Sequence, residues 1–391
     1  MEPKKKYTWP AFSVSEAKIV SNVLRSNKVN YLFGHFGKEF ESKFASFSDA
    51  QHALAVANGT LALDACLRSL KVSQGDEVLV TSRSFIASAS SIALLGAIPV
   101  WCDVDLNSQN ISIDEIIRKT SKKTKGIICV HFAGLPCEMN EIIKFAKQKN
   151  LFVVEDCAQA HGAKINGMSV GSFGDMSAWS FCNDKIMTLG GEGGMITTNS
   201  INLYERAAAF NNHGKNLKRY FSQKKHLNFP YIHDSIGSNY RLTEMQSALG
   251  IYQLDKMEKW ISLRARNASM FINKIKELGI VQLPSFPKHV THAWYKLYIT
   301  LNPTKLKKSH SRSSILQKLQ SQSVPCSFGG SGEIYLEKAF NKINSQKKGS
   351  LPNASFLENN SIMLEVHPTI PKKEIARRSS ILQSVLKDAQ K

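Results

Sequence analysis

The sequence predicts an α/β protein with a large unit built around a mostly parallel sheet and a smaller C-terminal α+β unit. Through the first half of the chain, short apolar runs bounded by turns alternate with helical patterns, the order expected of crossover units in a parallel sheet. The runs are continuously apolar, as expected of strands covered on both faces. After Leu283-Pro284 and Phe286-Pro287 the pattern changes. A chain of 391 residues is long enough for two such units.

The order of the elements follows from these runs. In the large unit, placed at residues 1–255, the predicted strands are 77–80, 97–101, 126–130, 151–154 and 195–198, with a helix at 140–149. Residues 242–276 contain no Gly or Pro except Gly250, which predicts one long helix leading into the small unit at 256–391. That unit is expected to hold a strand at 292–301, a helix at 311–322, a loop with one short helix at 328–352, a strand at 361–366 and a final helix at 371–387.

Composition indicates a cytoplasmic protein with no membrane segment. Hydrophobic residues make up 42% and charged residues 21%, ordinary values for a soluble globular protein. The most apolar stretch, residues 86–100, is interrupted by serines, a glycine and a proline, so it does not suit a membrane span. Residues 1–10 hold no apolar signal-peptide region. None of the seven cysteines forms a C-x-x-C pair, which indicates reduced, mostly buried thiols.

The formal net charge of +20 favours anionic partners. Lysines are dense at 215–225 and 305–308, but no nucleic-acid-binding signature accompanies them. A solvated basic surface is therefore favoured over a nucleic-acid patch, and no nucleic-acid partner is expected. A nucleotide-sugar substrate would also suit a basic site, although net charge alone does not indicate one.

The strongest local signal is an apolar strand that runs directly into Glu155-Asp156-Cys157-Ala158-Gln159. Ligands of such sheets bind outside the carboxyl ends of the strands, where Asp156 would stand. A pyridoxal cofactor needs a carboxylate that keeps its pyridine nitrogen protonated, so that the ring accepts electrons. Gln159 could donate to the phenolic oxygen of that ring. An equally good alternative for Asp156 is the N-cap of a helix.

Lys185 follows Asp156 by 29 residues and precedes four glycines within residues 190–194. A Schiff-base lysine must reach the aldehyde while the carboxylate holds the opposite edge of the ring, and two successive strand ends supply that arrangement. The glycines permit positive φ and close backbone approach. Taken alone, Lys185 would normally be a surface lysine before a turn, and it indicates a Schiff base only together with the other motifs. The chain contains neither G-x-G-x-x-G nor G-x-x-x-x-G-K-[ST], which disfavours hydride and phosphoryl transfer.

Two further segments suit the same cofactor. Gly59-Thr60 begins an Ala/Leu-rich helix, whose N-terminal amides and threonine hydroxyl could bind phosphate. The alternative is an ordinary N-cap by Asn58 or Thr60. Phe85 comes shortly after the strand at 77–80 and could stack on the cofactor ring, although a single phenylalanine is more often part of the core.

Together these segments resemble the DegT/StrS-type family of sugar aminotransferases, within the fold-type-I pyridoxal-phosphate superfamily. The matching motifs occur in order over nearly the whole chain: Asn58-Gly59-Thr60, residues 155–162, Ser180-Phe181 with Lys185, residues 191–194, His213-Gly214, and residues 237–241. Each motif is modest, but their joint order and spacing are specific.

The resemblance implies a role for each of these residues with pyridoxal 5'-phosphate. Lys185 would be the Schiff-base lysine and proton shuttle, Asp156 would face the pyridine nitrogen, and Gln159 would face the phenolic oxygen. The phosphate would be bound by Gly59, Thr60 and Ser180, and Phe85 would lie against the ring. Asn239 would reach the phosphate across a dimer interface, so a homodimer is expected.

The sequence departs from the family pattern near the expected sugar site. Relatives often have His where this chain has Cys182, and His-Leu-Tyr-Gly where it has His131-Phe132-Ala133-Gly134. These differences put the identity of the sugar in doubt, and not the use of the cofactor. His131 and His213 are candidate substrate contacts, with a structural role the alternative for His131. No metal site is expected, because His131, His161 and His213 lack ligand spacing.

The resulting hypothesis is an aminotransferase that moves an amino group, from glutamate by family resemblance, to a nucleotide-linked keto sugar in polysaccharide or glycan precursor biosynthesis. One rival is another pyridoxal-phosphate enzyme, such as a sugar dehydratase or lyase. Some relatives become dehydratases by replacing the lysine with histidine, and Lys185 argues against that outcome. The other rival is a non-enzymatic regulator or nucleic-acid binder that uses the basic surface.

Overall fold

The computed structural model describes residues 7–222, 231–343 and 347–391. Its α-helices are α1 (Val14–Arg25), α2 (Phe36–Phe47), α3 (Gly59–Ser69), α4 (Ala87–Ala93), α5 (Ile113–Lys119), α6 (Met139–Lys149), α7 (Ile201–Asn211), α8 (Leu217–Ser222), α9 (Glu244–Leu254), α10 (Met257–Ile275), α11 (Arg312–Ser321), α12 (Pro352–Asn360) and α13 (Lys372–Ala389). Its strands are β1 (His52–Val56), β2 (Glu77–Thr81), β3 (Ile98–Cys102), β4 (Thr124–Val130), β5 (Phe152–Asp156), β6 (Lys164–Ile165), β7 (Met168–Ser169), β8 (Met176–Ser180), β9 (Gly194–Thr198), β10 (Val281–Gln282), β11 (Val290–Thr291), β12 (Leu297–Leu301), β13 (Cys326–Ser327) and β14 (Ser361–Leu364). The basic segment at 215–225 lies partly outside the described residues.

The large sheet has seven strands in the order β1-β9-β8-β5-β4-β2-β3. β8, β5, β4, β2 and β3 pair in parallel, and β9 runs antiparallel to its neighbours β1 and β8. The mostly parallel sheet predicted from the sequence is therefore confirmed. β1 and β8 were not among the predicted strands, because both are rich in Ala and Ser, residues that carry little strand signal.

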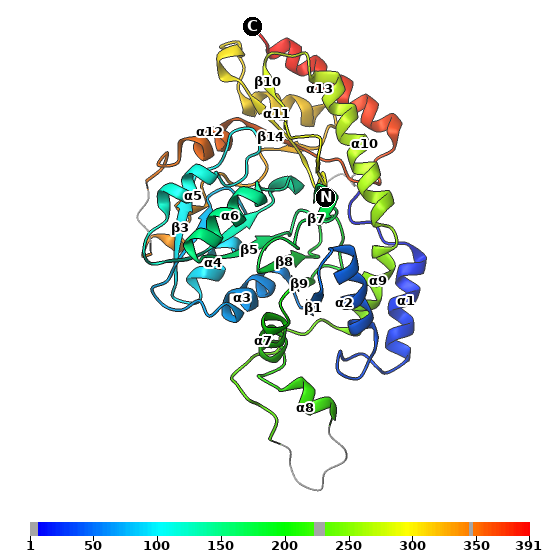
Figure 1. The fold of residues 1–391 in the computed structure, drawn as a ribbon. Helices are drawn as coiled ribbons and strands as arrows, with labels where there is room; N and C mark the ends of the chain where they lie inside the picture. Colours follow the sequence, from blue (N-terminus) through cyan, green and yellow to red (C-terminus); the bar gives the residue numbers. More distant parts are fainter. Residues whose placement is uncertain (1–6, 223–230, 344–346) are drawn as a thin grey trace.

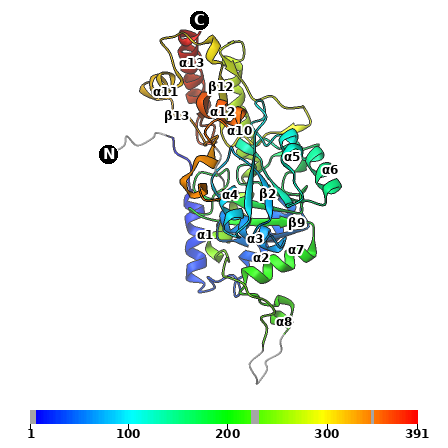
Figure 2. The same ribbon diagram turned by 90° about the vertical axis from the view of Figure 1, so that its left-hand side faces the viewer.

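Helices cover both faces of this sheet (Figures 1 and 2). Val78 and Val80 of β2 join the core under α3, α4 and α7, whereas Leu79 joins the core under α5 and α6. Successive side chains of a strand point to opposite faces, so a strand buried on both sides must be apolar throughout. This burial accounts for the uninterrupted apolar runs in the sequence.

The long helix predicted at 242–276 is instead two helices, α9 and α10. Thr243 and Gln246 form a capping box that starts α9, and the helix ends at Asp255. Gly250 does not cause the break. It lies inside α9, where a Cβ atom would come within 2.7 Å of the Phe40 ring, so its lack of a side chain permits close packing against α2.

A second sheet of four antiparallel strands, in the order β10-β12-β14-β13, packs with α10, α11 and α13 around its own core. The strand predicted at 292–301 is wrong in its first half, because only Leu297–Leu301 pairs in this sheet. Residues Val290–Thr291 form β11, which pairs with β6 near the large sheet. This early pairing draws the segment before β12 towards the large sheet.

The segment predicted as a loop with one short helix, 328–352, contains two 3-10 turns, Ile334–Leu336 and Lys338–Phe340. Tyr335 and Phe340 lie against Trp101 of β3, with ring centroids 6.1 and 5.0 Å away. The chain therefore returns to the core of the large sheet after leaving it. Among the described residues, no helix has both the length and the apolar character needed to cross a bilayer.

Candidate active site

One edge of the large sheet collects most of the residues singled out in the sequence. β5 and β8 are parallel, so Asp156 and Ser180 end at the same edge. Gly194 begins the antiparallel β9 opposite Ser180 and Val56, so the start of α3 lies at that edge too. Residues 181–193, which include Lys185, connect β8 to β9 there. The edge is the carboxyl end of the parallel strands, where ligands of such sheets bind.

Asp156 is buried at this edge, and its carboxylate is held by donors. Oδ2 accepts a hydrogen bond of 2.7 Å from the Ser88 hydroxyl, and Oδ1 accepts one of 3.2 Å from the backbone N–H of Ala158. The Ser88 hydroxyl lies 2.8 Å from that of Ser84. No helix begins after Asp156, so the N-cap alternative is wrong. The residue presents a fixed acid at the strand end.

Lys185 is half-buried, and contacts from distant segments fix its position. Its carbonyl oxygen accepts a hydrogen bond of 2.7 Å from the Trp9 indole, and its Nζ lies 5.0 Å from the centroid of the Tyr295 ring. Tyr295 is brought there by its backbone N–H, which donates to the carbonyl oxygen of Ala133 after β4 at 3.0 Å. The Tyr295 hydroxyl donates in turn to the carboxylate of Asp184.

The start of α3 forms a close contact with the end of β8. Asn58 caps the helix by accepting from the N–H of Leu61 at 2.9 Å, so Asn58 and not Thr60 is the N-cap. A Cβ atom on Gly59 would lie 2.7 Å from Cβ of Ser180, and one on Gly194 would lie 2.4 Å from the backbone of Asn58. Glycine at these positions lets the first turn of α3 and the Ser180 hydroxyl lie close together. Helix N-terminal amides with hydroxyl donors are suited to an anion such as phosphate.

Gln159 and Phe85 each keep a group free for a ligand. Oε1 of Gln159 accepts from the N–H of Ala133 at 2.7 Å, which leaves its Nε2 as the donor. Phe85 precedes α4 and is 68% exposed, so it is not a core residue and its ring can cover a ligand.

His131 has a structural environment. It is fully buried, its Nδ1 accepts from the N–H of Cys137 at 3.0 Å, and its Nε2 lies 3.0 Å from Oε2 of Glu155. Glu155 also accepts from the backbone N–H groups of a loop at 171–174. Both ring nitrogens are therefore engaged, and the placement of His131 corrects the expectation that it contacts substrate.

Among the described residues, His131, Glu155 and Cys157 form a group with metal-ligand atoms within 4.8 Å of one another. Hydrogen bonds within the protein already use the histidine and the carboxylate, and burial raises the pKa of the Cys157 thiol well above its ordinary value. A protonated thiol is a poor metal ligand. The group is a buried structural network.

His213 and Asn239 are exposed and lie together in the segment beyond α7. The N–H of His213 donates to the carbonyl oxygen of Ser238 at 2.8 Å, and Asn212 forms a bridge with Asn239. The following residues run beside the end of β1, because the N–H of Ala57 donates to the carbonyl oxygen of Tyr240 at 2.7 Å. The structure thus brings Asn239 near the edge that holds Gly59, but does not bring His213 to Lys185.

Sequence reasoning missed Trp9, Ser88, Tyr295 and Lys296. Ser88 lies in a serine-rich helix three residues after Phe85, a signal that could have been followed. Trp9 and the pair Tyr295-Lys296 reach Lys185 from far away in the chain, and no local pattern marks them. His161, in the motif at 155–162, is buried among aromatic rings. Burial is the main cause that lowers the pKa of His161 to about 3, and the nearby charge of Lys185 lowers it further.

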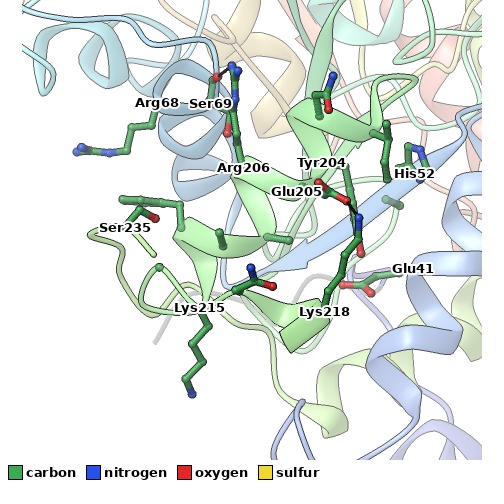
Figure 3. Close-up of a pocket in the computed structure, with 18 of the residues that line it drawn as sticks. Glu41, His52, Arg68, Ser69, Tyr204, Glu205, Arg206, Lys215, Lys218 and Ser235 are labelled. Carbon is green, nitrogen blue, oxygen red and sulfur yellow. Dashed lines mark hydrogen bonds and ion pairs between the residues drawn. The ribbon is translucent and has the colours of Figure 1, made fainter. Parts of the chain in front are cut away.

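A large pocket of about 1270 Å³ lies elsewhere, between α2, α7, the start of β1 and the end of α3. Figure 3 shows Lys218 joined to Glu205 and Arg206 joined to Ser69 along its wall. Lys185, Asp156 and Gly59 are not among its lining residues. The start of β1 and the end of α3 lie opposite the sheet edge described above, so this pocket is not the cofactor site.

The sheet edge fits pyridoxal 5'-phosphate by its donor set. It offers a cradle of helix N-terminal amides and hydroxyls that a Cβ on Gly59 would fill, a buried carboxylate for a protonated ring nitrogen, an amide donor, and a half-buried amine. The cradle, the carboxylate and the amine come from connections of neighbouring strands, as the sequence motifs require.

Comparison with known proteins gives the same assignment. Residues 11–383 match the model of the DegT/DnrJ/EryC1/StrS aminotransferase family. GDP-perosamine synthase of Escherichia coli O157:H7 is 38% identical over 310 residues, which cover 79% of this chain and 81% of that protein. The dTDP-3-amino-3,6-dideoxy-alpha-D-galactopyranose transaminase of Aneurinibacillus thermoaerophilus is 32% identical over 347 residues, 89% of each chain.

Among solved structures, an aminotransferase from Psychrobacter cryohalolentis superimposes with a TM-score of 0.96 at 43% identity, covering 98% of this chain and 99% of that one. Both the fold and the family-specific motifs extend over nearly the whole length of the chain. The chain therefore belongs to the DegT/DnrJ/EryC1/StrS aminotransferase family and is a pyridoxal-phosphate-dependent aminotransferase.

Proposed function

We propose that this aminotransferase moves an amino group from glutamate to a keto sugar carried on a nucleotide, as a step towards a polysaccharide or glycan precursor. The two relatives named above are named for GDP-linked and dTDP-linked sugars, and each aligns with most of the chain. The observation that carries the proposal is the single sheet edge on which Lys185, Asp156 and the start of α3 all lie. An amine, an acid and an anion cradle at one edge are what transfer of an amino group requires.

The cofactor, when bound, supplies an electron-accepting ring that stabilises negative charge on the carbon that loses its proton. In our proposal Lys185 takes that proton with its amine and returns it to a neighbouring carbon, acting as general base and then as general acid. Asp156 keeps a proton on the ring nitrogen, and the hydroxyl of Ser88 fixes the orientation of its carboxylate. The first turn of α3, Thr60 and Ser180 hold the phosphate, and Phe85 excludes water from one face of the ring.

We further propose that the active form is a homodimer, with Asn239 reaching the phosphate in the partner subunit. Helix α8 stands away from the body of the molecule, at the end opposite α13 (Figure 1). Ile236, which follows this helix in the chain, is 94% exposed, and Tyr231 is 84% exposed; exposed apolar side chains that lie close together in the chain are typical of a surface that another chain covers. The resemblance to the family supports the same arrangement. A cytoplasmic location is supported by seven free cysteines, which suit a reducing compartment.

The test begins with the donor half-reaction. Protein purified with pyridoxal 5'-phosphate should show an absorbance band near ~420 nm. Adding L-glutamate should remove that band and release 2-oxoglutarate, and a suitable nucleotide-linked keto sugar should restore it with an amino sugar as product. A panel of GDP-, dTDP- and UDP-linked keto sugars would identify the acceptor. Lys185→Ala should give neither the band nor the reaction.

Two outcomes would favour the rivals. A product that has lost a hydroxyl group and gained no nitrogen would indicate a sugar dehydratase. Protein that binds nucleic acid tightly at physiological salt but takes up no cofactor would indicate a regulator.

A further inference from the structure

Two ammonium groups flank one tyrosine ring in the candidate active site. Lys185 Nζ lies 5.0 Å and Lys296 Nζ 5.1 Å from the centroid of the Tyr295 ring. Lys296 comes from the residue before β12, and its side chain is only 17% exposed. A second, largely buried amine therefore contacts the same ring as the amine that carries the reaction.

The positive charge of Lys296 has a carboxylate nearby, that of Asp184, but at a long distance for an ion pair. Its Nζ is 3.9 Å from Oδ2 of Asp184, longer than the 2.7–2.9 Å typical of a charge-assisted hydrogen bond. The Asp184 side chain is half exposed and already accepts a hydrogen bond from Tyr295. Glu365, the other carboxylate that acts on Lys296, lies 3.5 Å from His367.

Further positive charge surrounds this amine. Burial lowers the pKa of Lys296, and the charges of Arg264 and Lys185 lower it further, while Asp184 and Glu365 oppose the shift. Arg264 is itself fully buried, and its guanidinium donates hydrogen bonds to the neutral carbonyl oxygens of Trp294 and Tyr295. A buried cation without a close anion is destabilised, so an anionic ligand that enters here is favoured.

We propose that Lys296 binds a carboxylate of the amino donor and so selects an acidic amino acid. The inference rests on the proposed function. The α-carbon of the donor must come to Nζ of Lys185, and its carboxylates follow within a few bonds. Nζ of Lys296 contacts the same Tyr295 ring as Nζ of Lys185, so it is the amine that can receive one of these carboxylates. The diphosphate of a nucleotide sugar hangs from the anomeric carbon, away from the keto carbon that accepts the amine. The donor carboxylate replaces Asp184 as the partner of the Lys296 ammonium group. The Asp184 side chain is half exposed, so it can turn towards water.

The chain offers a matched control for Lys296. Lys256 also lies against aromatic rings, with Nζ 4.4 Å from the Tyr252 centroid and 5.7 Å from that of Trp260, and it also pairs with a carboxylate, that of Glu16 at 3.0 Å. It belongs to the turn between α9 and α10, and its described contacts are with Glu16, Tyr252 and Trp260. Substitution of either lysine removes a partly buried ammonium group that lies near a carboxylate, but only substitution of Lys296 removes a cation from the candidate active site.

The experiment compares wild-type holoenzyme with K296Q, K296R and K256Q. The rate at which the absorbance band disappears is measured against L-glutamate concentration. K296Q should require about 10- to 100-fold more glutamate for half-maximal rate, as expected when a charged hydrogen bond is lost. K296R should need a glutamate concentration much closer to that of the wild type, and K256Q should need the same concentration as the wild type. An unchanged glutamate dependence in K296Q, or an equal loss in K256Q, overturns the proposal.

L-Alanine as donor shows which carboxylate is bound. If Lys296 binds the side-chain carboxylate, K296Q weakens glutamate and leaves alanine unchanged. If it binds the α-carboxylate, both donors are weakened. The first result supports the selection of an acidic donor by Lys296. The second keeps Lys296 as a carboxylate contact but overturns its role in selecting an acidic donor.

Calorimetric titration with glutarate, a dicarboxylate without an amino group, separates this inference from the proposed function. Wild type and K256Q should bind glutarate alike, and K296Q about 10- to 100-fold more weakly. If no glutamate half-reaction occurs but this binding pattern holds, the proposed donor is wrong and Lys296 remains a carboxylate site. If K296Q binds glutarate as wild type does, or no protein binds it, the inference about Lys296 fails.

Discussion

The hydroxyl of Ser88 donates a hydrogen bond of 2.7 Å to Oδ2 of Asp156, and a second hydroxyl, of Ser84, lies 2.8 Å behind it. The pair joins the first turn of α4 to the end of β5. It orients a buried carboxylate before any ligand arrives, so the acid of the site is prepared by residues that need not touch the substrate.

Replacing Ser88 by Ala should loosen the cofactor without unfolding the protein. Oδ2 of Asp156 would lose its donor while staying buried, at a cost of about 1–3 kcal/mol. Pyridoxal 5'-phosphate should therefore dissociate more readily on dialysis, by about 10-fold. Ser88→Thr, which keeps the hydroxyl, is the control. Equal cofactor affinity in all three proteins would show that Ser88 does not position Asp156.

Gly59→Ala should damage the phosphate cradle. The new Cβ would lie 2.7 Å from Cβ of Ser180, and overpacking of this kind costs about 1–3 kcal/mol. Cofactor affinity, measured by fluorescence titration of the apoprotein, should fall by about 10-fold or more. Gly279→Ala is the matched control, because a Cβ there would meet nothing within 4 Å. A fall of the same size in both variants would point to a general loss of stability.

Stability should fall in acid partly through His161. Burial, followed by the charges of Lys185 and Arg264, lowers the pKa of His161 from 6.5 to about 3. Unfolding below pH 6.5 therefore takes up a proton, and the stabilisation from the neutral ring, complete above pH 6.5, is lost as pH falls towards 3.

His161→Phe should remove this part of the pH dependence. The free energy of unfolding of the variant should fall less steeply between about pH 6.5 and pH 5, by up to ~1.4 kcal/mol per pH unit. Phenylalanine also suits the aromatic surroundings of Phe44, Trp179 and Phe181. Denaturant titrations at a series of pH values would check this, and identical slopes for both proteins would contradict it.

The homodimer can be tested at Ile236. Ile236→Asp places a charge on a side chain that is 94% exposed in the single chain and would be covered in the dimer. We expect the variant to elute as a monomer, or to dissociate at about 10-fold higher concentration than wild type, in light-scattering chromatography. Val14→Asp is the control. It places the same charge on another exposed β-branched residue, 86% exposed at the start of α1, and should leave the dimer intact. A dimer of unchanged affinity in Ile236→Asp would exclude this surface.

Much of the fold and the central site residues could be predicted from local patterns. Continuous apolar runs identified β2, β3, β4, β5 and β9, because strands covered on both faces must be apolar throughout. Asp156, Lys185 and Gly59 follow the ends of strands or precede a helix, and parallel strands end at one edge, so their placement at one edge needs only the strand order. β8 was not predicted, because its Ser- and Ala-rich sequence has no continuous apolar run.

Sequence alone therefore determined the fold class and the family, and it predicted the acid, amine and phosphate segments that the structure brings to one sheet edge, because each depends on residues adjacent in the chain. Tertiary structure alone decided that Trp9, Tyr295 and Lys296 surround Lys185, that Ser88 supports Asp156, and that His131 is fully engaged inside the protein. Contacts between distant segments, such as Ser88 with Asp156 at 68 residues and Trp9 with Lys185 at 176 residues apart, depend on how whole layers pack. No local period or motif encodes that packing.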